Sequence, residues 1–338
     1  MIIMNFNSSA VLPFLRLVFV VAAYVSLLFL ASCKLDNDEE FPNYDWVSQY
    51  TLDKTMVEVN TANAATAFET VFQEMITDSV SQSSFCQSFI SPVRFLDDSS
   101  GYFFVETYRA WMVAHATQQA LVGTNRMEVQ DVNGKYYVKD MVNTAVFNGY
   151  GFVEYFFNNP VSGMVERKLG FVKNIPSAEM FVGSGFYSDP PKLYYTHEAA
   201  RIKVAESATR SMAAGIGGVL ASQPADSLSG VELCRRLIDH VRFFDDQSGY
   251  FFMYDFRCHN VAHGIQKNLQ GQNLYDYQDS RGTFVIRELL ALASGNSNGG
   301  YLEYYWNNPV TGNEEPKLAY VIKVPGIDYF IGSGIYLD

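Results

Sequence analysis

Two stretches of this chain are nearly identical: EYYWNNPVTG at residues 303–312 and EYFFNNPVSG at residues 154–163. The likeness continues outward from both of them. RFLDDSSGYFF at residues 94–104 matches RFFDDQSGYFF at residues 242–252 without a gap, and a later VGSGFY matches IGSGIY. Self-similarity at a fixed spacing is the signature of a duplicated structural unit. The sequence therefore predicts two copies of one fold.

Each copy shows the same order of predicted elements. A long helical stretch comes first, two strands and a loop follow, and an amphipathic helix and three strands close the unit. This order is typical of an α+β fold with one antiparallel sheet of about five strands, and we expect its helices on one face. We place the first module at residues 55–187 and the second at residues 197–338, with a proline-containing linker at residues 188–196.

The first 33 residues have the pattern of a bacterial lipoprotein signal peptide. An apolar run follows Arg16 and ends in LASC, which resembles a lipobox with Cys33 as the lipidated residue. Residues 34–54 then form an acidic tether without a core pattern. The alternative is an uncleaved membrane anchor at residues 11–32, which is just long enough to span a bilayer. Either arrangement puts the rest of the chain outside the cytoplasm, in the periplasm or at the cell surface.

Charge and motif content exclude several classes of function. The formal net charge is −12, so nucleic acid and anionic lipid surfaces would repel the chain, and we expect no nucleic-acid partner. No phosphate-binding Gly-Lys-Ser/Thr loop and no dinucleotide-binding glycine fingerprint occurs. The sequence therefore predicts neither an enzyme nor a bound cofactor.

Several short phrases recur in both copies in the same order. They are GYFF, AHA or AHG, GTN or GQN, DVNG or DSRG, EYFFNNP or EYYWNNP, KLGF or KLAY, and GSGFY or GSGIY. In this combination each copy resembles an extracellular Cache sensor domain of the kind called single Cache type 2. The resemblance implies a PAS-like fold that binds small molecules, often short carboxylates, outside the cell. It does not imply catalysis.

The two copies depart from the family pattern to different degrees. Neither keeps the proline that follows the family's histidine, and the first copy has Phe157 and Phe171 where the second has Trp306 and Tyr320. We therefore expect the second module to be the better ligand binder. The first module would have a structural role or a different ligand.

The candidate ligand-binding residues are polar or aromatic side chains that recur in both copies. A desolvated lysine needs an acceptor, arginine matches a carboxylate with two hydrogen bonds, and histidine, tyrosine and tryptophan donate from apolar surroundings. In the second module they are Arg242, Tyr250, His263, Tyr304, Trp306, Lys317 and Tyr320. Their weaker counterparts in the first module are Arg94, Tyr102, His115, Tyr155 and Lys168. The alternatives are solvent-facing lysines, local arginine–aspartate pairs, backbone-bonded histidines and aromatic core residues.

Cysteine content leaves one disulfide bond open. Beyond Cys33 the chain has Cys86, Cys234 and Cys258, an odd number for an oxidising compartment. Cys234 and Cys258 are the candidates for a bond. Cys258 also lies near two histidines, but no fourth ligand is evident, and we expect no metal site.

These observations favour a lipid-anchored extracytoplasmic protein that recognises a small organic anion, as a sensor or solute-recognition protein. We expect no output domain after the final GIYLD, so the signal would pass to a partner in the membrane, a receptor or a transporter. The alternative is a structural or interaction lipoprotein whose Cache folds bind no small ligand.

Overall fold

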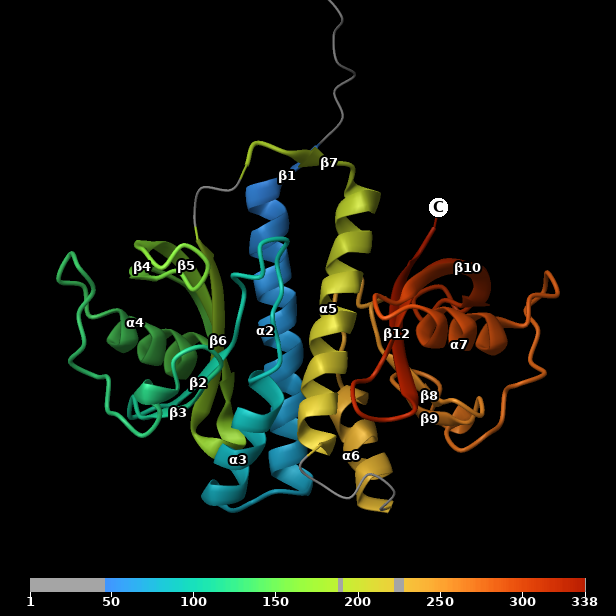
Figure 1. The fold of residues 1–338 in the computed structure, drawn as a ribbon, viewed down its shortest axis with the longest axis horizontal. Coiled ribbons are helices and arrows are strands. Elements are labelled where there is room, and N and C mark those ends of the chain that lie inside the picture. The colour runs from blue at the N-terminus through green and yellow to red at the C-terminus, as the bar shows by residue number, and fades with distance from the viewer. Residues whose placement is uncertain (1–45, 188–190, 222–227, 338) are drawn as a thin grey trace, which may run out of the picture. The chain divides into compact units, whose positions relative to one another are not determined.

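The computed structural model describes residues 46–187, 191–221 and 228–337. The predicted signal peptide with Cys33, and residues 34–45 of the tether, lie outside the described residues. Within the described part the duplicated α+β architecture is confirmed. Two five-stranded antiparallel sheets are present, and a long helix precedes each of them (Figure 1).

The first module has the sheet order β3-β2-β6-β5-β4. Its strands are β2 (Phe104–Thr107), β3 (Met112–His115), β4 (Tyr150–Asn158), β5 (Val165–Ile175) and β6 (Met180–Tyr187). Its helices are α2 (Gln49–Glu74), α3 (Ser79–Ile90) and α4 (Tyr137–Asn143), with short helical turns at Gln119–Leu121, Thr144–Asn148 and Pro176–Ala178.

The second module repeats this arrangement with the order β9-β8-β12-β11-β10. Its strands are β8 (Phe252–Asp255), β9 (Asn260–His263), β10 (Gly300–Asn307), β11 (Glu314–Lys323) and β12 (Tyr329–Tyr336). Its helices are α5 (His197–Leu220), α6 (Leu228–Ile238) and α7 (Val285–Gly295), with a short turn at Lys267–Leu269.

The two long helices begin at side-chain caps. The hydroxyl of Ser48 accepts a hydrogen bond from the Thr51 amide, and the Thr196 hydroxyl accepts one from the Ala199 amide. Such hydroxyl caps satisfy amides that the first helical turn leaves free. Helix α2 therefore starts at Gln49, before residue 55, the predicted start of the first module. The preceding strand β1 (Val47–Ser48) pairs with β7 (Tyr194–Tyr195) of the linker.

Helices cover both faces of each sheet, so the expectation of helices on one face is wrong. In β2 and the residue before it, Phe103 and Val105 pack with α2 and α3, whereas Phe104 packs toward α4. Neighbouring side chains of a strand point to opposite faces, and here both faces are apolar. Figure 1 shows α4 and α7 on the outer sides of the sheets, away from the central α2 and α5.

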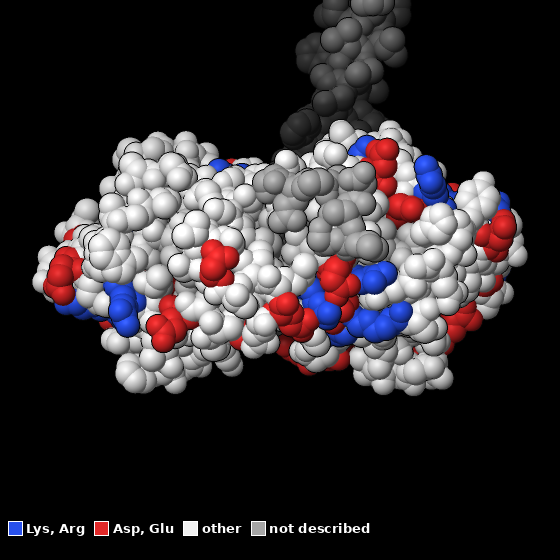
Figure 2. Space-filling model, turned by 90° about the horizontal axis from the view of Figure 1, so that it is seen from below, with Lys and Arg blue, Asp and Glu red and all other residues white. Residues whose placement is uncertain are grey.

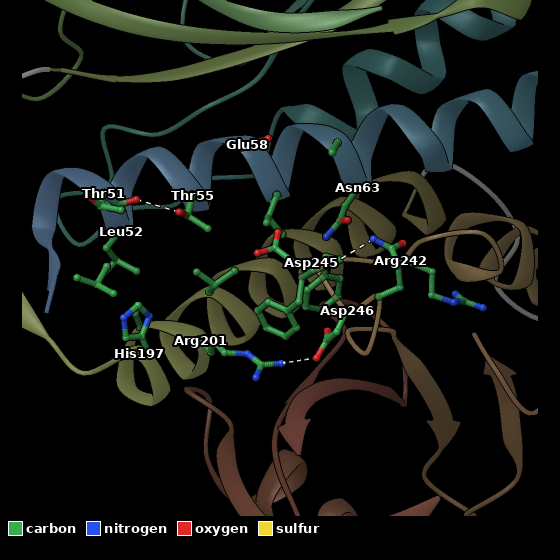
Figure 3. A pocket seen from close by; sticks show the side chains of 18 residues that line it. Thr51, Leu52, Thr55, Glu58, Asn63, His197, Arg201, Arg242, Asp245 and Asp246 are labelled. Atoms are coloured by element: carbon green, nitrogen blue, oxygen red, sulfur yellow. Dashed lines mark hydrogen bonds and ion pairs between the residues drawn. The ribbon is translucent and has the colours of Figure 1, made fainter. Parts of the chain in front are cut away.

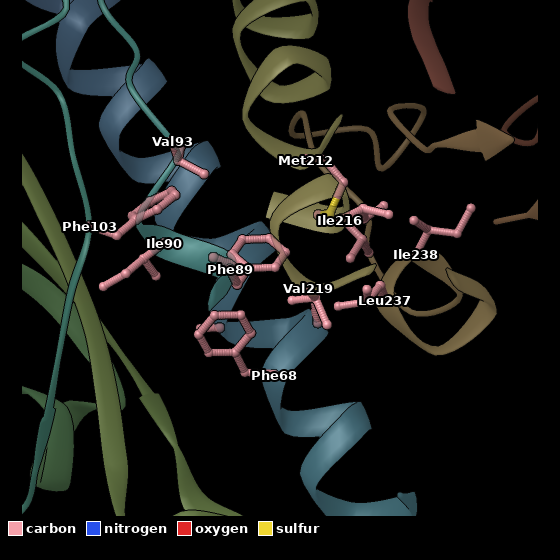
Figure 4. Close-up of a cluster of buried hydrophobic side chains, with 14 of the residues drawn as sticks. Phe68, Phe89, Ile90, Val93, Phe103, Met212, Ile216, Val219, Leu237 and Ile238 are labelled. Carbon is pink, nitrogen blue, oxygen red and sulfur yellow. The ribbon is translucent and has the colours of Figure 1, made fainter. Parts of the chain in front are cut away.

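One continuous core joins the two modules. Phe68 on α2 and Phe89 on α3 belong to the same buried cluster as Ile216 on α5 and Leu237 on α6 (Figure 4). Close approach here depends on small residues of α5. A methyl group added at Gly218 would lie 2.3 Å from the carbonyl oxygen of Ser88. The helices of both modules therefore form one packed unit.

Acidic and basic side chains are interspersed on the face shown in Figure 2. Described ion pairs such as Lys139–Glu128 and Lys323–Asp328 join opposite charges at the surface. This face carries no broad single-sign patch of the kind that nucleic acid binding requires.

Candidate ligand-binding sites

Each module contains one lysine that is fully buried on the sheet face toward α4 or α7. Lys168 on β5 pairs in register with Tyr155, and Lys317 on β11 pairs with Tyr304. Both lysines have no exposed surface, and neither Nζ atom has a hydrogen-bond partner among the described residues. An ammonium without an acceptor in such surroundings is costly, so the site requires an explanation.

Aromatic rings surround both ammonium groups. Lys317 Nζ lies 3.9 Å from the ring centre of Tyr250 and 4.9 Å from that of Tyr336. Lys168 Nζ has the same neighbours in the first module, Tyr102 at 3.9 Å and Tyr187 at 5.0 Å. Ring faces attract a cation but carry no charge to balance it. Burial lowers the pKa of Lys317 to about 7 and also lowers the pKa of Lys168.

His115 and His263, the two histidines predicted as ligand-binding residues, lie beside these lysines and are neutral hydrogen-bond donors. Burial and the neighbouring lysine lower the pKa of His115 and of His263 to about 3. In the second module the Nδ1 atom of His263 accepts from the amides of Ile265 and Gln266, at 3.3 and 2.9 Å. A neutral ring whose Nδ1 accepts carries its proton on Nε2. The loop thus fixes the tautomer, and each ring can donate from Nε2.

Tyrosine and tryptophan side chains complete the second site. Tyr250 and Tyr336 are joined through their hydroxyl groups at 3.2 Å, and Tyr336 donates to the carbonyl of Asn307 at 2.6 Å. Trp306 donates from Nε1 to Gln266 at 3.0 Å, and its ring lies 6.2 Å from that of His263. The predicted residues Tyr250, His263, Tyr304, Trp306 and Lys317 therefore converge on one buried region.

The corresponding region of the first module encloses a small cavity. Its volume is about 10 Å³, which is room for about one water molecule. The predicted residues Tyr102, His115 and Tyr155 line it. Tyr155 stacks on Tyr137 of α4 with the ring centres 4.6 Å apart. Side chains must therefore move before any organic ligand can enter.

Tyr320 does not belong to the second site, which corrects the prediction. Lys317, Ala319 and Val321 of β11 face α7, whereas Leu318 and Ile322 pack on the opposite face with the shared core. Alternation along the strand puts Tyr320 on that opposite face. Its hydroxyl donates to the carbonyl of Asn298, and the guanidinium of Arg210 on α5 lies 4.9 Å from its ring centre.

The two arginines that the sequence predicted as anion ligands, Arg94 and Arg242, donate hydrogen bonds to backbone carbonyl groups instead. Arg94 donates to the carbonyls of Ser91, Val93 and Ala116, at 2.6 to 3.1 Å. Arg242 makes the equivalent bonds to the carbonyls of Asp239, Val241 and Gly264. In the first module these bonds join the end of α3 to the segment after β3, and in the second they join the end of α6 to the segment after β9. The arginines thus have a structural role in place of the predicted role as anion ligands.

Arg242 also borders a groove of about 790 Å³ between α2 and α5. Figure 3 shows Thr51, Leu52 and Thr55 on one side of this groove and Arg201 on the other. Arg201 pairs with Asp246 at 3.2 Å, so its charge is already balanced. No unpaired buried cation marks the groove among its described lining residues, in contrast to the lysine sites.

The Cys234–Cys258 disulfide that the sequence left open is not formed. Both thiols are free and buried, and so is that of Cys86. Cys234 on α6 belongs to the shared core, whereas Cys258 packs with the cluster on the α7 face. The sheet separates the two sulfur atoms, and a disulfide needs Cα atoms within about 7 Å.

The segment between α7 and β10 contains a serine motif that also occurs in hydrolases. GNSNG at residues 295–299 fits the Gly-x-Ser-x-Gly pattern of hydrolase nucleophiles. It lies between the end of α7 and the start of β10, a helix-to-strand turn. The nucleophile elbow is a strand-to-helix turn, so this segment lacks the geometry that activates the serine.

A second group of polar residues, which the sequence did not predict, lies on the same sheet faces. In the first module Glu106, Arg126 and Tyr137 line the cavity with His115. The Nε of Arg126 lies 3.7 Å from Glu106, and Arg126 also donates to the Tyr137 hydroxyl. In the second module Asn260 of β9 is buried, and neither atom of its amide has a partner among the described residues. No local motif announces these residues, because strand register and loop packing bring them together.

The model of the Single Cache domain 2 family matches residues 51–190 and again residues 196–338. The chain belongs to this family. Cache domains are extracellular small-molecule sensors, and the tandem arrangement inferred from the repeat is confirmed. None of the helices in the described part of the chain is long and apolar enough to cross a bilayer.

Relatives of the chain include sensor kinases and chemoreceptors. The Rhizobium johnstonii sensor histidine kinase MctS is 38% identical over 27% of this chain and 20% of its own length. The Pseudomonas putida methyl-accepting chemotaxis protein McpP is 28% identical over 38% of this chain and 25% of its own length. A solved chemotaxis protein structure from Vibrio parahaemolyticus is 30% identical, with a TM-score of 0.32, and the match covers 36% of this chain and 82% of that one. The chain thus matches a quarter or less of these curated relatives.

Proposed function

We propose that this protein binds a small organic anion outside the cytoplasm and passes the occupied state to a partner protein in the membrane. Lipid on Cys33 would hold it at a bacterial membrane. The partner would be a receptor or a transporter. This proposal adds the class of ligand, the anchor and the partner to what the family establishes.

The observation that carries the proposal is the uncompensated lysine in each module. Lys317 and Lys168 are fully buried, and no acceptor for either ammonium is found among the described residues. Removing a charge from water costs several kcal/mol unless an opposite charge and hydrogen bonds offset it. A carboxylate beside Nζ would supply both, and His263 Nε2 in the second module could donate a further bond.

Entry of the ligand would change the protein. The cavity of the first module has room for about one water molecule, so even a short carboxylate must displace side chains of α4 or of the sheet. A ligand shifts a conformational equilibrium only by its differential affinity for the two states. Charge compensation at the lysine supplies such a difference, and the displaced elements would carry the signal.

The test is calorimetric titration of the purified full-length protein with acetate and propionate at constant ionic strength. We expect Lys317→Met to weaken binding to the second module by about 2–5 kcal/mol, the usual loss when one partner of a buried charge pair is removed. Lys168→Met should do the same for the first module. The matched control is Lys323→Met, which removes an exposed lysine of the same strand that pairs with Asp328.

An unchanged affinity in both buried-lysine variants would refute the proposed clamp. Saturating ligand should also raise the stability of the wild type, by about 2.7 kcal/mol at 100 times the dissociation constant. The small cavity of the first module favours the alternative function, an interaction lipoprotein whose pockets are filled by their own side chains. The absence of binding by a broad set of carboxylates, amino acids and amines would support that alternative.

A further inference from the structure

The two modules share the lysine end of the site but differ at its other end. Glu106 pairs across the strands with Met112, and the equivalent pair in the second module is Tyr254 with Asn260. The counterpart of Arg126 in the second module is Leu274. The two residues make equivalent backbone hydrogen bonds, from Arg126 to the carbonyl of Ala110 and from Leu274 to the carbonyl of Cys258. The first module thus has two ionisable side chains, Glu106 and Arg126, where the second module has a tyrosine and a leucine.

The charged pair of the first module is buried and incompletely satisfied. Glu106 is 2% exposed and Arg126 is 6% exposed, with Arg126 Nε 3.7 Å from Oε1 of Glu106. The second carboxylate oxygen, Oε2, is buried and has no hydrogen-bond partner among the described residues. An unpaired buried acceptor costs about as much as a lost hydrogen bond, so Oε2 calls for a donor.

The position of that oxygen points to a ligand. Glu106 and Arg126 line the cavity of about 10 Å³ together with His115. The cavity next to the pair has room for one small polar group. Lys168 is not among the described residues that line this cavity, but its ammonium lies 3.9 Å from the ring centre of Tyr102, which does line it. A ligand held at its carboxylate by Lys168 and His115 would therefore direct its carbon chain toward Glu106 and Arg126.

We propose that the first module selects short carboxylates that carry a hydroxyl group, and that Glu106 and Arg126 recognise this hydroxyl. The inference rests on the proposed function, because it assumes that Lys168 holds the carboxylate. A hydroxyl donates one hydrogen bond and accepts others, so it can donate to Glu106 Oε2 and accept from the guanidinium. An ammonium group can only donate, so it could pair with Glu106 but would leave the Arg126 guanidinium without an acceptor and beside a like charge. A methylene group would leave Oε2 unpaired.

The experiment compares four probes of similar size: L-lactate, D-lactate, propionate and alanine. Calorimetric titrations use the full-length Lys317→Met protein, so that the measured binding belongs to the first module. We expect one enantiomer of lactate to bind at least about ten-fold more tightly than propionate, since a bond to a charged group is worth that much or more. We expect alanine to bind more weakly than lactate.

Two variants connect this preference to the pair. Glu106→Gln keeps the shape and removes the charge, and it should reduce the preference for lactate. The double variant Glu106→Leu with Arg126→Leu removes both partners of the hydroxyl and should abolish the preference while propionate still binds. Glu128→Gln, which makes the same change at an exposed glutamate paired with Lys139, is the matched control and should leave the preference unchanged.

The outcomes separate the inference from the proposed function. Equal affinities for lactate and propionate, both lost in Lys168→Met, would overturn the hydroxyl assignment and keep the anion clamp. Tighter binding of alanine than of lactate would overturn it as well. Binding of none of the four probes, in the Lys317→Met protein and in the wild type, would refute both the hydroxyl assignment and the anion clamp.

Discussion

At the scale of single residues, the buried charge of Lys317 lowers the stability of the fold. Its ammonium is buried among aromatic rings without a counter-charge, and its pKa is lowered from 10.5 to about 7. The folded state therefore holds this proton less tightly than the unfolded chain does. Functional sites commonly carry such destabilising groups.

We predict that Lys317→Met stabilises the ligand-free protein in a pH-dependent way. Below about pH 7 the charged lysine destabilises the fold fully, and between about pH 7 and 10.5 the unfolded chain binds more protons, so this cost disappears as pH rises. The variant should therefore gain roughly 2–5 kcal/mol at pH 6 and little at pH 10. Denaturant unfolding of both proteins at the two pH values measures this. A gain that does not depend on pH would show that the folded and unfolded chains hold this proton equally tightly, so that the pKa of Lys317 is not lowered in the fold.

The sequence predicted those site residues whose signal lies within one strand, and it did not predict those that are brought together from distant parts of the chain. A lysine that recurs inside two apolar strands is a local signal, and both lysines are buried as an anion clamp would require. The prediction for Tyr320 was wrong although the sequence held the signal. Tyr320 is three residues from Lys317 on the same strand, and residues three apart on a strand point to opposite faces. Glu106 and Arg126 could not be predicted, since the pair depends on how the loop after β3 returns to the sheet.

At the scale of elements, the helix packing depends on α5 having small residues where α3 crosses it. Gly215 and Gly218 face α3, and a methyl group at Gly218 would meet the Ser88 carbonyl oxygen at 2.3 Å. The alanine- and glycine-rich composition of α5 predicted a helix. What the composition could not predict was its partner, because the other module's helix supplies the contact.

We predict that Gly218→Ala destabilises the protein by about 1–3 kcal/mol, the usual cost of overpacking a rigid contact. The better helix propensity of alanine opposes this by at most about 1 kcal/mol. Gly295→Ala on α7 is the control, because a methyl group there meets no atom within 4 Å. It should be neutral or slightly stabilising in the same urea titration. Equal effects of the two substitutions would show that α3 and α5 are not in close contact.

At the scale of the whole molecule, the duplication produces one core shared by two sheets. Asn60 of α2 donates to Ser207 of α5 at 3.0 Å, and the buried cluster contains side chains from all four helices α2, α3, α5 and α6. The repeat predicted two modules, and it was silent on their interface because a repeated sequence does not say which surfaces meet. Because the helices join the two modules, both sheets pack against the same core. A change in one sheet therefore affects a core that also contacts the other sheet.

We predict that the two modules unfold together. Since the shared cluster includes Phe89 from the first module and Ile216 from the second, unfolding one module would expose apolar surface of the other. Differential scanning calorimetry should show one transition whose calorimetric and van't Hoff enthalpies agree. Gly218→Ala should move this transition as a whole. Two separated transitions, of which the substitution shifts only one, would mean that each module is stable without the shared core, and signal transfer between them would then need another route.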